Sequence, residues 1–174
     1  MFKEWPKIPR YKGNYVTITE KMDGTNACII IEDNKIVGCQ SRSRVITPED
    51  DNYGFANWVS RFQDELLGLG DGYHYGEWVG AGIQKNPHGF DKKYFYLFNS
   101  GRWNEDSPPP NCCKVVRVLY EGPLTLTTVE EVLGNLSVEA EFEGYKPEGI
   151  ILYHHDTRTY SKATYKNPEG KWRE

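Results

Sequence analysis

The chain has 174 residues, of which 38% are hydrophobic and 14% aromatic, and it carries a formal net charge of −4 at pH 7. This length and apolar content fit one domain with a sizeable core, which excludes a disordered protein. No stretch approaches the ~18 consecutive apolar residues of a membrane-spanning helix, and the N-terminal residues lack the apolar segment of a secretory signal. We therefore expect no membrane partner. We also expect a monomer, located in the cytoplasm or, if the protein is phage-encoded, in the cytoplasm of the host.

The placement of charge along the chain bears on whether the protein can bind nucleic acid. A net negative charge weighs mildly against nucleic-acid binding, but placement matters more than the sum. Residues 35–44 carry three bases and no acid, and residues 158–174 carry five bases and two acids, so a locally basic cleft is compatible with the overall charge. The cysteines and histidines show no metal-ligand spacing. We assign them as reduced thiols and as surface or packing residues: Cys28, Cys39, Cys112, Cys113, His74, His88, His154 and His155.

In chain order, the pattern is mostly strand. Alternating residues or short apolar runs between turn residues predict strands over residues 15–19, 27–31, 36–39, 73–79, 94–98, 115–120, 150–153 and 159–165. Residues 32–35 predict a hairpin turn between the second and third of these strands.

Two helices are predicted between the strands. Apolar residues at helical spacing predict an amphipathic helix over residues 55–67; they are Phe55, Trp58, Val59, Phe62 and Leu66. A second, short helix is predicted to begin near Thr128, where Thr128 and Glu131 fit a capping box. Strands and helices together indicate one α+β domain of antiparallel sheets flanked by a few helices.

The stretch EKMDGTN, residues 20–26, follows the first predicted strand. Asp-Gly is a common turn dipeptide, and K-x-D-G occurs by chance in roughly a few per cent of chains this long, so an ordinary turn is one interpretation. The other makes Lys21 a nucleophile, with Gly24 letting the backbone pass close to a ligand. An attacking lysine must be neutral, and lowering its pKa from ~10.4 to about 7.5 corresponds to ~4 kcal/mol. Nearby cations or a divalent metal can supply this, whereas a carboxylate beside the amine opposes it.

Residues 20–26 resemble the first motif of the covalent nucleotidyltransferases, which are DNA ligases, RNA ligases and mRNA capping enzymes. The Thr25-Asn26 extension is similar to ATP-dependent RNA ligases of the bacteriophage and editing type. The later motifs of that family are matched in order by residues 41–44, 75–80, 94–99, 148–153 and 162–166. The resemblance spans residues 20–166 and implies the nucleotidyltransferase fold of a ligase adenylation domain.

The resemblance also implies contacts to the nucleotide. Glu77 and Asn26 are implied as ribose contacts, Phe98 as the ring that stacks on adenine, and Glu20 as an acceptor for the adenine amino group. An aromatic residue in a strand is usually a core residue, and Glu20 also fits a plain surface position. Both alternatives stay open.

Phosphate and metal contacts are implied near the C-terminal end. Lys162 and Lys166, with Thr164 between them, fall on one face of a predicted strand, and the resemblance implies that they bind the triphosphate; a solvated strand face is the alternative. The family spacing is K-x-K and the spacing here is K-x-x-x-K, so the lysine that contacts the α-phosphate stays open. Glu148 is implied as a ligand of catalytic Mg²⁺ or Mn²⁺, with a turn carboxylate as the alternative.

The implied reaction uses ATP to join strand ends. Lys21 takes AMP from ATP, AMP passes to a 5′-phosphate, and a 3′-hydroxyl displaces it. Arg44, and in second place Arg42, are implied to position an RNA, or DNA, strand through a phosphate or sugar. We expect residues 1–174 to form a single minimal nucleotidyltransferase domain with no appended C-terminal domain, because too few residues follow Lys166. That favours an RNA ligase; a minimal ATP-dependent DNA ligase and a non-catalytic end-binding protein with this fold are the alternatives.

Overall fold

The structure is a computed structural model that describes residues 13–166 and 168. The first sheet is formed by β1 (Tyr15–Glu20), β8 (Val118–Pro123), β9 (Gly149–His154) and β10 (Thr159–Thr164). The second sheet is formed by β2 (Thr25–Glu32), β3 (Lys35–Ser41), β4 (Val45–Ile46), β5 (Gly72–Gly80), β6 (Lys93–Leu97) and β7 (Cys113–Val115). The helices are α1 (Phe55–Arg61), α2 (Gln63–Leu66), the 3₁₀ turn η1 (Leu67–Leu69) and α3 (Thr128–Glu143).

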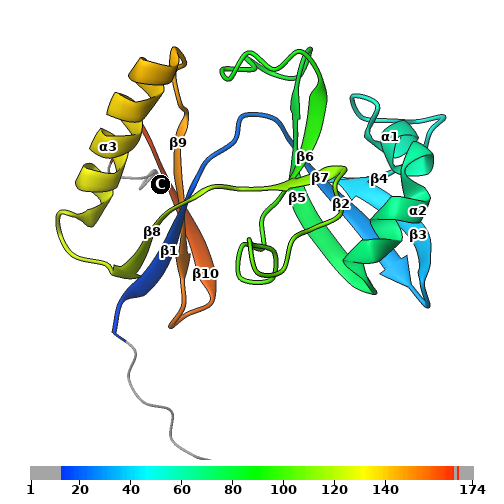
Figure 1. The fold of residues 1–174 in the computed structure, drawn as a ribbon, viewed down its shortest axis with the longest axis horizontal. Coiled ribbons are helices and arrows are strands. Elements are labelled where there is room, and N and C mark those ends of the chain that lie inside the picture. The colour runs from blue at the N-terminus through cyan, green and yellow to red at the C-terminus, as the bar shows by residue number, and fades with distance from the viewer. Residues whose placement is uncertain (1–12, 167, 169–174) are drawn as a thin grey trace, which may run out of the picture.

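The four-stranded sheet has the strand order β10-β9-β1-β8, and all its neighbours are antiparallel. Alternation along β1 and β9 turns Val16, Ile18, Ile150 and Leu152 to one face, where they pack with Leu136 of α3 into a buried cluster. Because α3 covers only this face (Figure 1), the opposite face of the sheet is turned toward the rest of the molecule.

The six-stranded sheet has the order β4-β3-β2-β5-β6-β7, in which only the β6–β7 pair is parallel. Its core lies under α1, where the rings of Phe55 and Trp58 sit 5.3 and 5.1 Å from the ring of Trp78. The helices α1 and α2 lie on the outer side of this sheet, away from the four-stranded sheet (Figure 1). The helix-free faces of both sheets therefore look toward the middle of the molecule.

The two sheets meet where β1 ends. The Glu20 backbone N–H donates to the Arg117 carbonyl at 3.0 Å, and the Lys21 N–H donates to the Gly149 carbonyl at 2.9 Å. The chain then crosses to β2 through residues 21–24 (Figure 1). The EKMDGTN stretch thus contains one crossing between the two sheets, and residues 116–117, between β7 and β8, form a second.

Most predicted strands are confirmed with shifts of one or two residues at their ends. The hairpin turn is confirmed as well: Asp33 and Asn34 have φ values of 50° and 58°, which is the backbone that a two-residue hairpin requires. The predicted strand over residues 115–120 is wrong, because β7 ends at Val115 and β8 begins at Val118 in the other sheet. The last strand ends at Thr164, one residue earlier than predicted.

The helix predictions are only partly correct. The helix over residues 55–67 is divided at Phe62, whose φ of −106° departs from helical geometry. The spacing of apolar residues indicates which face of a helix is buried, but it does not reveal a local break in the backbone. The helix near Thr128 is not short, since it has 16 residues. Its capping box is absent: Thr127 is the N-cap and its side chain makes no capping hydrogen bond, while Thr128 Oγ1 accepts from the Thr125 N–H. In the described part of the chain, no helix is long and apolar enough to cross a membrane.

Candidate active site

Lys21 lies directly after β1, at the junction of the two sheets. Its Nζ donates to Oε1 of Glu148 at 2.6 Å, and the two side chains are 19% and 34% exposed. Glu148 directly precedes β9, and the hydrogen bond from Lys21 N–H to Gly149 extends the β1–β9 pairing by one residue. The fold thus brings the predicted nucleophile and the predicted metal-binding carboxylate into direct contact across 127 positions of sequence.

Gly24 holds the connection close to β5. A Cβ at this position would lie 2.2 Å from the Trp78 carbonyl oxygen and 2.7 Å from Cγ1 of Val79, so no larger residue fits. The backbone that Gly24 approaches closely in the structure is therefore that of β5. On the same connection, Asp23 Oδ2 accepts a hydrogen bond from the Lys85 N–H at 3.3 Å. These contacts fix the segment that carries Lys21.

Asn26 and Glu77 are register partners on β2 and β5. Their neighbours Ala27 and Trp78 belong to the core under α1. Because side chains alternate along a strand, Asn26 and Glu77 lie on the opposite, helix-free face. The structure therefore places the two predicted ribose contacts side by side.

The carboxyl of Glu77 has an unusual proton affinity. Burial raises the pKa of Glu77 to about 7, with the negative charges of Glu148 and Asp23 adding to this and the positive charges of Lys21 and Arg42 opposing it. Glu77 therefore shares one electrostatic environment with the Lys21–Glu148 pair. Strongly perturbed carboxyls gathered with a lysine are typical of functional sites.

Glu20 is 5% exposed, so the surface alternative is wrong. Its Oε1 accepts from the Tyr145 hydroxyl at 2.8 Å and contacts Nε2 of His88 at 3.1 Å. Burial by itself raises the pKa of Glu20, but the hydrogen bonds with His88 and Tyr145 and the charges of His88 and Arg117 outweigh it and lower the pKa. His88 was assigned from sequence to surface or packing, and Tyr145 was not singled out. Neither belongs to a local motif, so only the tertiary contacts reveal them.

Phe98 lies one residue beyond β6, and its N–H donates to the Tyr75 carbonyl at 3.0 Å. The half-buried ring packs against a small buried cluster of Met22, Val79 and Val116. Met22 follows Lys21 in the sequence, so the ring belongs to the cluster next to the nucleophile. The position is compatible with both sequence interpretations, a base-stacking ring and a core residue.

The two C-terminal lysines differ in placement. Thr164 pairs with Gly149, whose carbonyl accepts from Lys21 N–H, so these three residues lie in one row across the sheet. Lys162 is exposed on β10, two residues or ~7 Å from that row. Because β10 ends at Thr164, Lys166 lies in the turn beyond it. The prediction that both lysines lie on one face of a strand therefore applies to Lys162 but not to Lys166.

The two arginines of the β3–β4 turn also differ. The Arg44 guanidinium donates to the carbonyls of Asp50 and Asp51 at 3.0 and 2.9 Å and pairs with the Asp50 carboxylate at 3.0 Å. Arg44 thus ties down the loop after β4. Arg42, the second choice from sequence, is the arginine whose charge acts on Glu77.

Glu148 has the property expected of a metal ligand. Its Oε2 is buried and has no hydrogen-bond partner among the described residues, although a buried polar atom normally has one. A carboxylate oxygen is the hard ligand that Mg²⁺ and Mn²⁺ prefer, so the residue fits a divalent cation. Among the described residues, no group of three or more His, Cys, Asp or Glu side chains is arranged to hold a metal.

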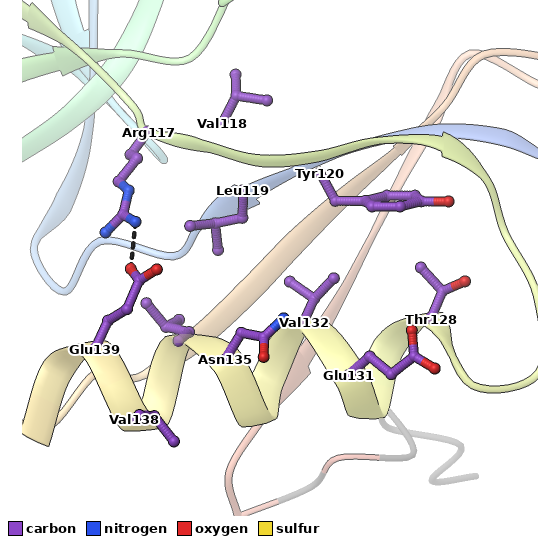
Figure 2. A pocket seen from close by; sticks show the side chains of 11 residues that line it. Arg117, Val118, Leu119, Tyr120, Thr128, Glu131, Val132, Asn135, Val138 and Glu139 are labelled. Carbon is purple, nitrogen blue, oxygen red and sulfur yellow. Dashed lines mark hydrogen bonds and ion pairs between the residues drawn. The ribbon is translucent and has the colours of Figure 1, made fainter.

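A separate groove of about 380 Å³ lies between β8 and α3 (Figure 2). Arg117 of the connection before β8 and Glu139 of α3 form an ion pair at one end of it. None of the site residues predicted from sequence lines this groove. The groove is therefore separate from the residues that the fold gathers at the junction of the sheets.

Comparison with known proteins gives one family and several similar structures. The family described as RNA ligase matches residues 14–168. A mutant of the Naegleria gruberi RNA ligase with ATP and Mn is 21% identical, with a TM-score of 0.63 over 89% of this chain and 50% of that chain. A second mutant with AMP and Mn is 21% identical, with a TM-score of 0.63 over 89% and 51%. The same ligase with PPi is 22% identical, with a TM-score of 0.63 over 89% and 50%.

These structural matches confirm the predicted α+β fold of a ligase adenylation domain. At this level of identity they show the fold alone. The chain spans about half the length of each of these solved relatives.

Proposed function

Because the chain belongs to the RNA ligase family, we propose that it is an ATP-dependent RNA ligase that works through a covalent lysyl-AMP on Lys21. The observation that carries this proposal is the contact between Lys21 Nζ and Glu148 at the junction of the sheets. Asn26, Glu77 and Phe98 lie around the same junction, which supports a nucleotide bound between the helix-free faces.

The first step follows from the chemistry of Lys21. Its Nζ attacks the α-phosphorus of ATP, a phosphorus–nitrogen bond forms, and the bond to the β-phosphate oxygen breaks to release pyrophosphate. The amine must lose a proton and its contact with Glu148 before it attacks, because only the neutral amine has a free electron pair. In-line placement and stabilisation of charge on the phosphate oxygens are the main sources of rate in such a transfer.

Positive charge for the phosphates is available on both sides of the Lys21 row. Lys162 lies before it on β10, and Lys166 lies after it in the turn. We assign both lysines to the phosphates, Lys162 more strongly. A Mg²⁺ or Mn²⁺ ion held by Glu148 would add charge that offsets the carboxylate and stabilises phosphate oxygens.

The later steps involve the strand ends. AMP passes from Lys21 to a 5′-phosphate, and a 3′-hydroxyl then attacks that phosphate, forms the phosphodiester and releases AMP. RNA is the proposed substrate because the family is that of RNA ligases. We assign Arg42 and Arg44 to the strand, with Arg42 nearer the reacting centre because its charge reaches Glu77.

The test is incubation with α-labelled ATP and Mg²⁺ or Mn²⁺, followed by denaturing electrophoresis. The wild-type protein should retain label and release pyrophosphate, and Lys21→Ala should retain none. Lys35→Ala, which removes an exposed lysine at the start of β3, is the matched control and should label normally. Undiminished labelling of Lys21→Ala would overturn the assignment of the nucleophile.

A further inference from the structure

Among the residues that the structure describes, the hydrogen bonds of the Glu20 carboxylate fall on one oxygen. Tyr145 Oη and His88 Nε2 both contact Oε1, at 2.8 and 3.1 Å. An ionised carboxylate only accepts hydrogen bonds, so His88 must carry its proton on Nε2 and donate it. Neither of these bonds uses Oε2.

The His88 ring is itself fixed by its neighbours. It stacks on Phe90 with centroids 5.1 Å apart and an interplanar angle of 2°, and on Tyr145 at 4.2 Å and 29°. Phe90 also packs against the cluster around Met22, which Phe98 joins. The ring that holds Glu20 is therefore part of the same packed unit as the proposed base-stacking residue.

The two residues that contact the Glu20 carboxylate come from different parts of the fold. His88 lies in the segment between β5 and β6 of the six-stranded sheet, and Tyr145 lies between α3 and β9. Glu20 ends β1 and immediately precedes Lys21. A change in either partner of Glu20 thus acts on the residue next to the nucleophile.

We propose that His88 is a specificity-determining positioning residue, which with Tyr145 holds Oε1 of Glu20 so that Oε2 accepts a hydrogen bond from the exocyclic amino group of adenine. This inference rests on the proposed use of ATP. Neither residue touches the reacting atoms, so their effect is on recognition of the base and not on the transfer of AMP.

Discrimination follows from the groups at position 6 of the purine. Adenine donates a hydrogen bond there, whereas hypoxanthine and guanine present an oxygen that only accepts. A carboxylate fixed opposite that oxygen leaves two acceptors unpaired, which disfavours the wrong base by about ten- to a hundredfold. Stacking on Phe98 makes no such distinction, because all purines offer a similar face.

The experiment compares self-labelling from ATP and from inosine triphosphate, which differ at the position that Glu20 faces. The wild-type protein should prefer ATP at least about tenfold. His88→Ala should lower that preference by raising KM for ATP while kcat stays unchanged, and Tyr145→Phe, which removes only the hydroxyl, should act in the same direction. His88→Gln retains a side-chain N–H donor and should restore most of the preference. His154→Ala, which removes an imidazole ring that contacts Ser161 Oγ at 2.7 Å, is the matched control.

The outcomes separate the inference from the proposed function. A wild-type protein that takes no label from ATP overturns the proposed function. Normal labelling with an ATP preference that is unchanged in folded His88→Ala and in Tyr145→Phe overturns the inference alone. An equal loss of self-labelling from ATP and from inosine triphosphate also overturns the inference, because it indicates that His88 and Tyr145 have a purely structural role. As a further check, His88→Ala should leave the preference unchanged when Glu20→Gln is already present.

Discussion

At the scale of single residues, Glu148 combines one strong contact with one missing contact. Oε1 accepts from Lys21 at 2.6 Å, while Oε2 is buried without a partner. Leaving a buried acceptor unpaired costs roughly 1–3 kcal/mol, and a partly exposed ion pair contributes about 0–1 kcal/mol. The residue therefore adds little to folding, which is typical of a position kept for function.

This gives a prediction for Glu148→Gln. The variant should keep its free energy of unfolding within about 1 kcal/mol of wild type but lose lysyl-AMP formation at every Mg²⁺ or Mn²⁺ concentration. Urea unfolding and a metal titration of self-labelling are the two measurements. Normal labelling across the titration would show that Glu148 is only structural. Glu139→Gln, on the surface of α3, is the matched control and should label normally.

Glu77 gives a prediction about pH. Its pKa of about 7 in the folded protein lies above the ordinary value, so between about pH 4.5 and 7 the folded state keeps a proton that the unfolded chain releases. Wild-type stability should therefore fall as pH rises through this window, and Glu77→Gln should remove that loss. Relative to wild type, the variant should gain roughly 2–3 kcal/mol between pH 4 and pH 8.

The measurement for Glu77→Gln is urea unfolding in EDTA at several pH values. Glu32→Gln, at the exposed end of β2, is the control, and its difference from wild type should change little with pH. A stability difference for Glu77→Gln that does not vary with pH would contradict the assigned proton affinity.

At the scale of elements, the start of β9 depends on a residue without a side chain. Gly149 has a φ of 153°, and a Cβ there would lie 2.2 Å from the Ala163 carbonyl oxygen of β10. Its own carbonyl accepts from the Lys21 N–H. The close β9–β10 pairing therefore fixes both the nucleophile and the neighbouring Glu148.

Two glycine substitutions should have opposite effects. Gly149→Ala should lower the free energy of unfolding by at least about 1–3 kcal/mol, through backbone strain and the clash with β10. Gly134→Ala should raise it by about 0.5–1 kcal/mol, because Gly134 lies within α3 and nothing lies within 4 Å of its added Cβ. Urea unfolding measures both. A Gly149→Ala variant as stable as wild type would contradict the observed packing.

At the scale of the whole molecule, two sheets with separate cores are joined by two chain crossings, residues 21–24 and residues 116–117 (Figure 1). The net charge of −4 gives no general attraction for RNA, so binding must depend on a few local cations. Arg42 and Arg44 are the ones assigned to the strand. Each phosphate contact on a single strand contributes about 0.7 to the dependence of log K on log salt concentration.

The prediction concerns a 5′-phosphorylated single-stranded RNA. Its binding constant, measured between 50 and 200 mM KCl, should fall with a log–log slope of about −1.4, and Arg42→Ala should reduce the magnitude of that slope by about 0.7. Lys35→Ala is the control at the far end of β2 and β3. An unchanged slope in Arg42→Ala would remove that arginine from the RNA contact.

Local sequence was sufficient to predict most elements, and it singled out two residues that the fold brings into contact. The period of apolar residues is a local property, so it located the strands and the buried face of α1, but it could not show the break at Phe62. The motif order pointed to Lys21 and Glu148, and the structure brings the two into contact. The roles assigned to all the site residues stay predictions, although Asn26 and Glu77 do lie side by side.

Only the tertiary structure decided the partners that come from distant segments. The contacts of Glu20 with His88 and Tyr145 span 68 and 125 positions, and no local spacing encodes them. The raised pKa of Glu77 arises from burial and from the summed charges of four residues, which exist only after both sheets have formed. Side-chain type and period are carried by neighbouring residues, whereas burial and electrostatic environment are properties of the packed molecule. The sequence therefore determined which groups are present, and the fold determined which of them act on one another.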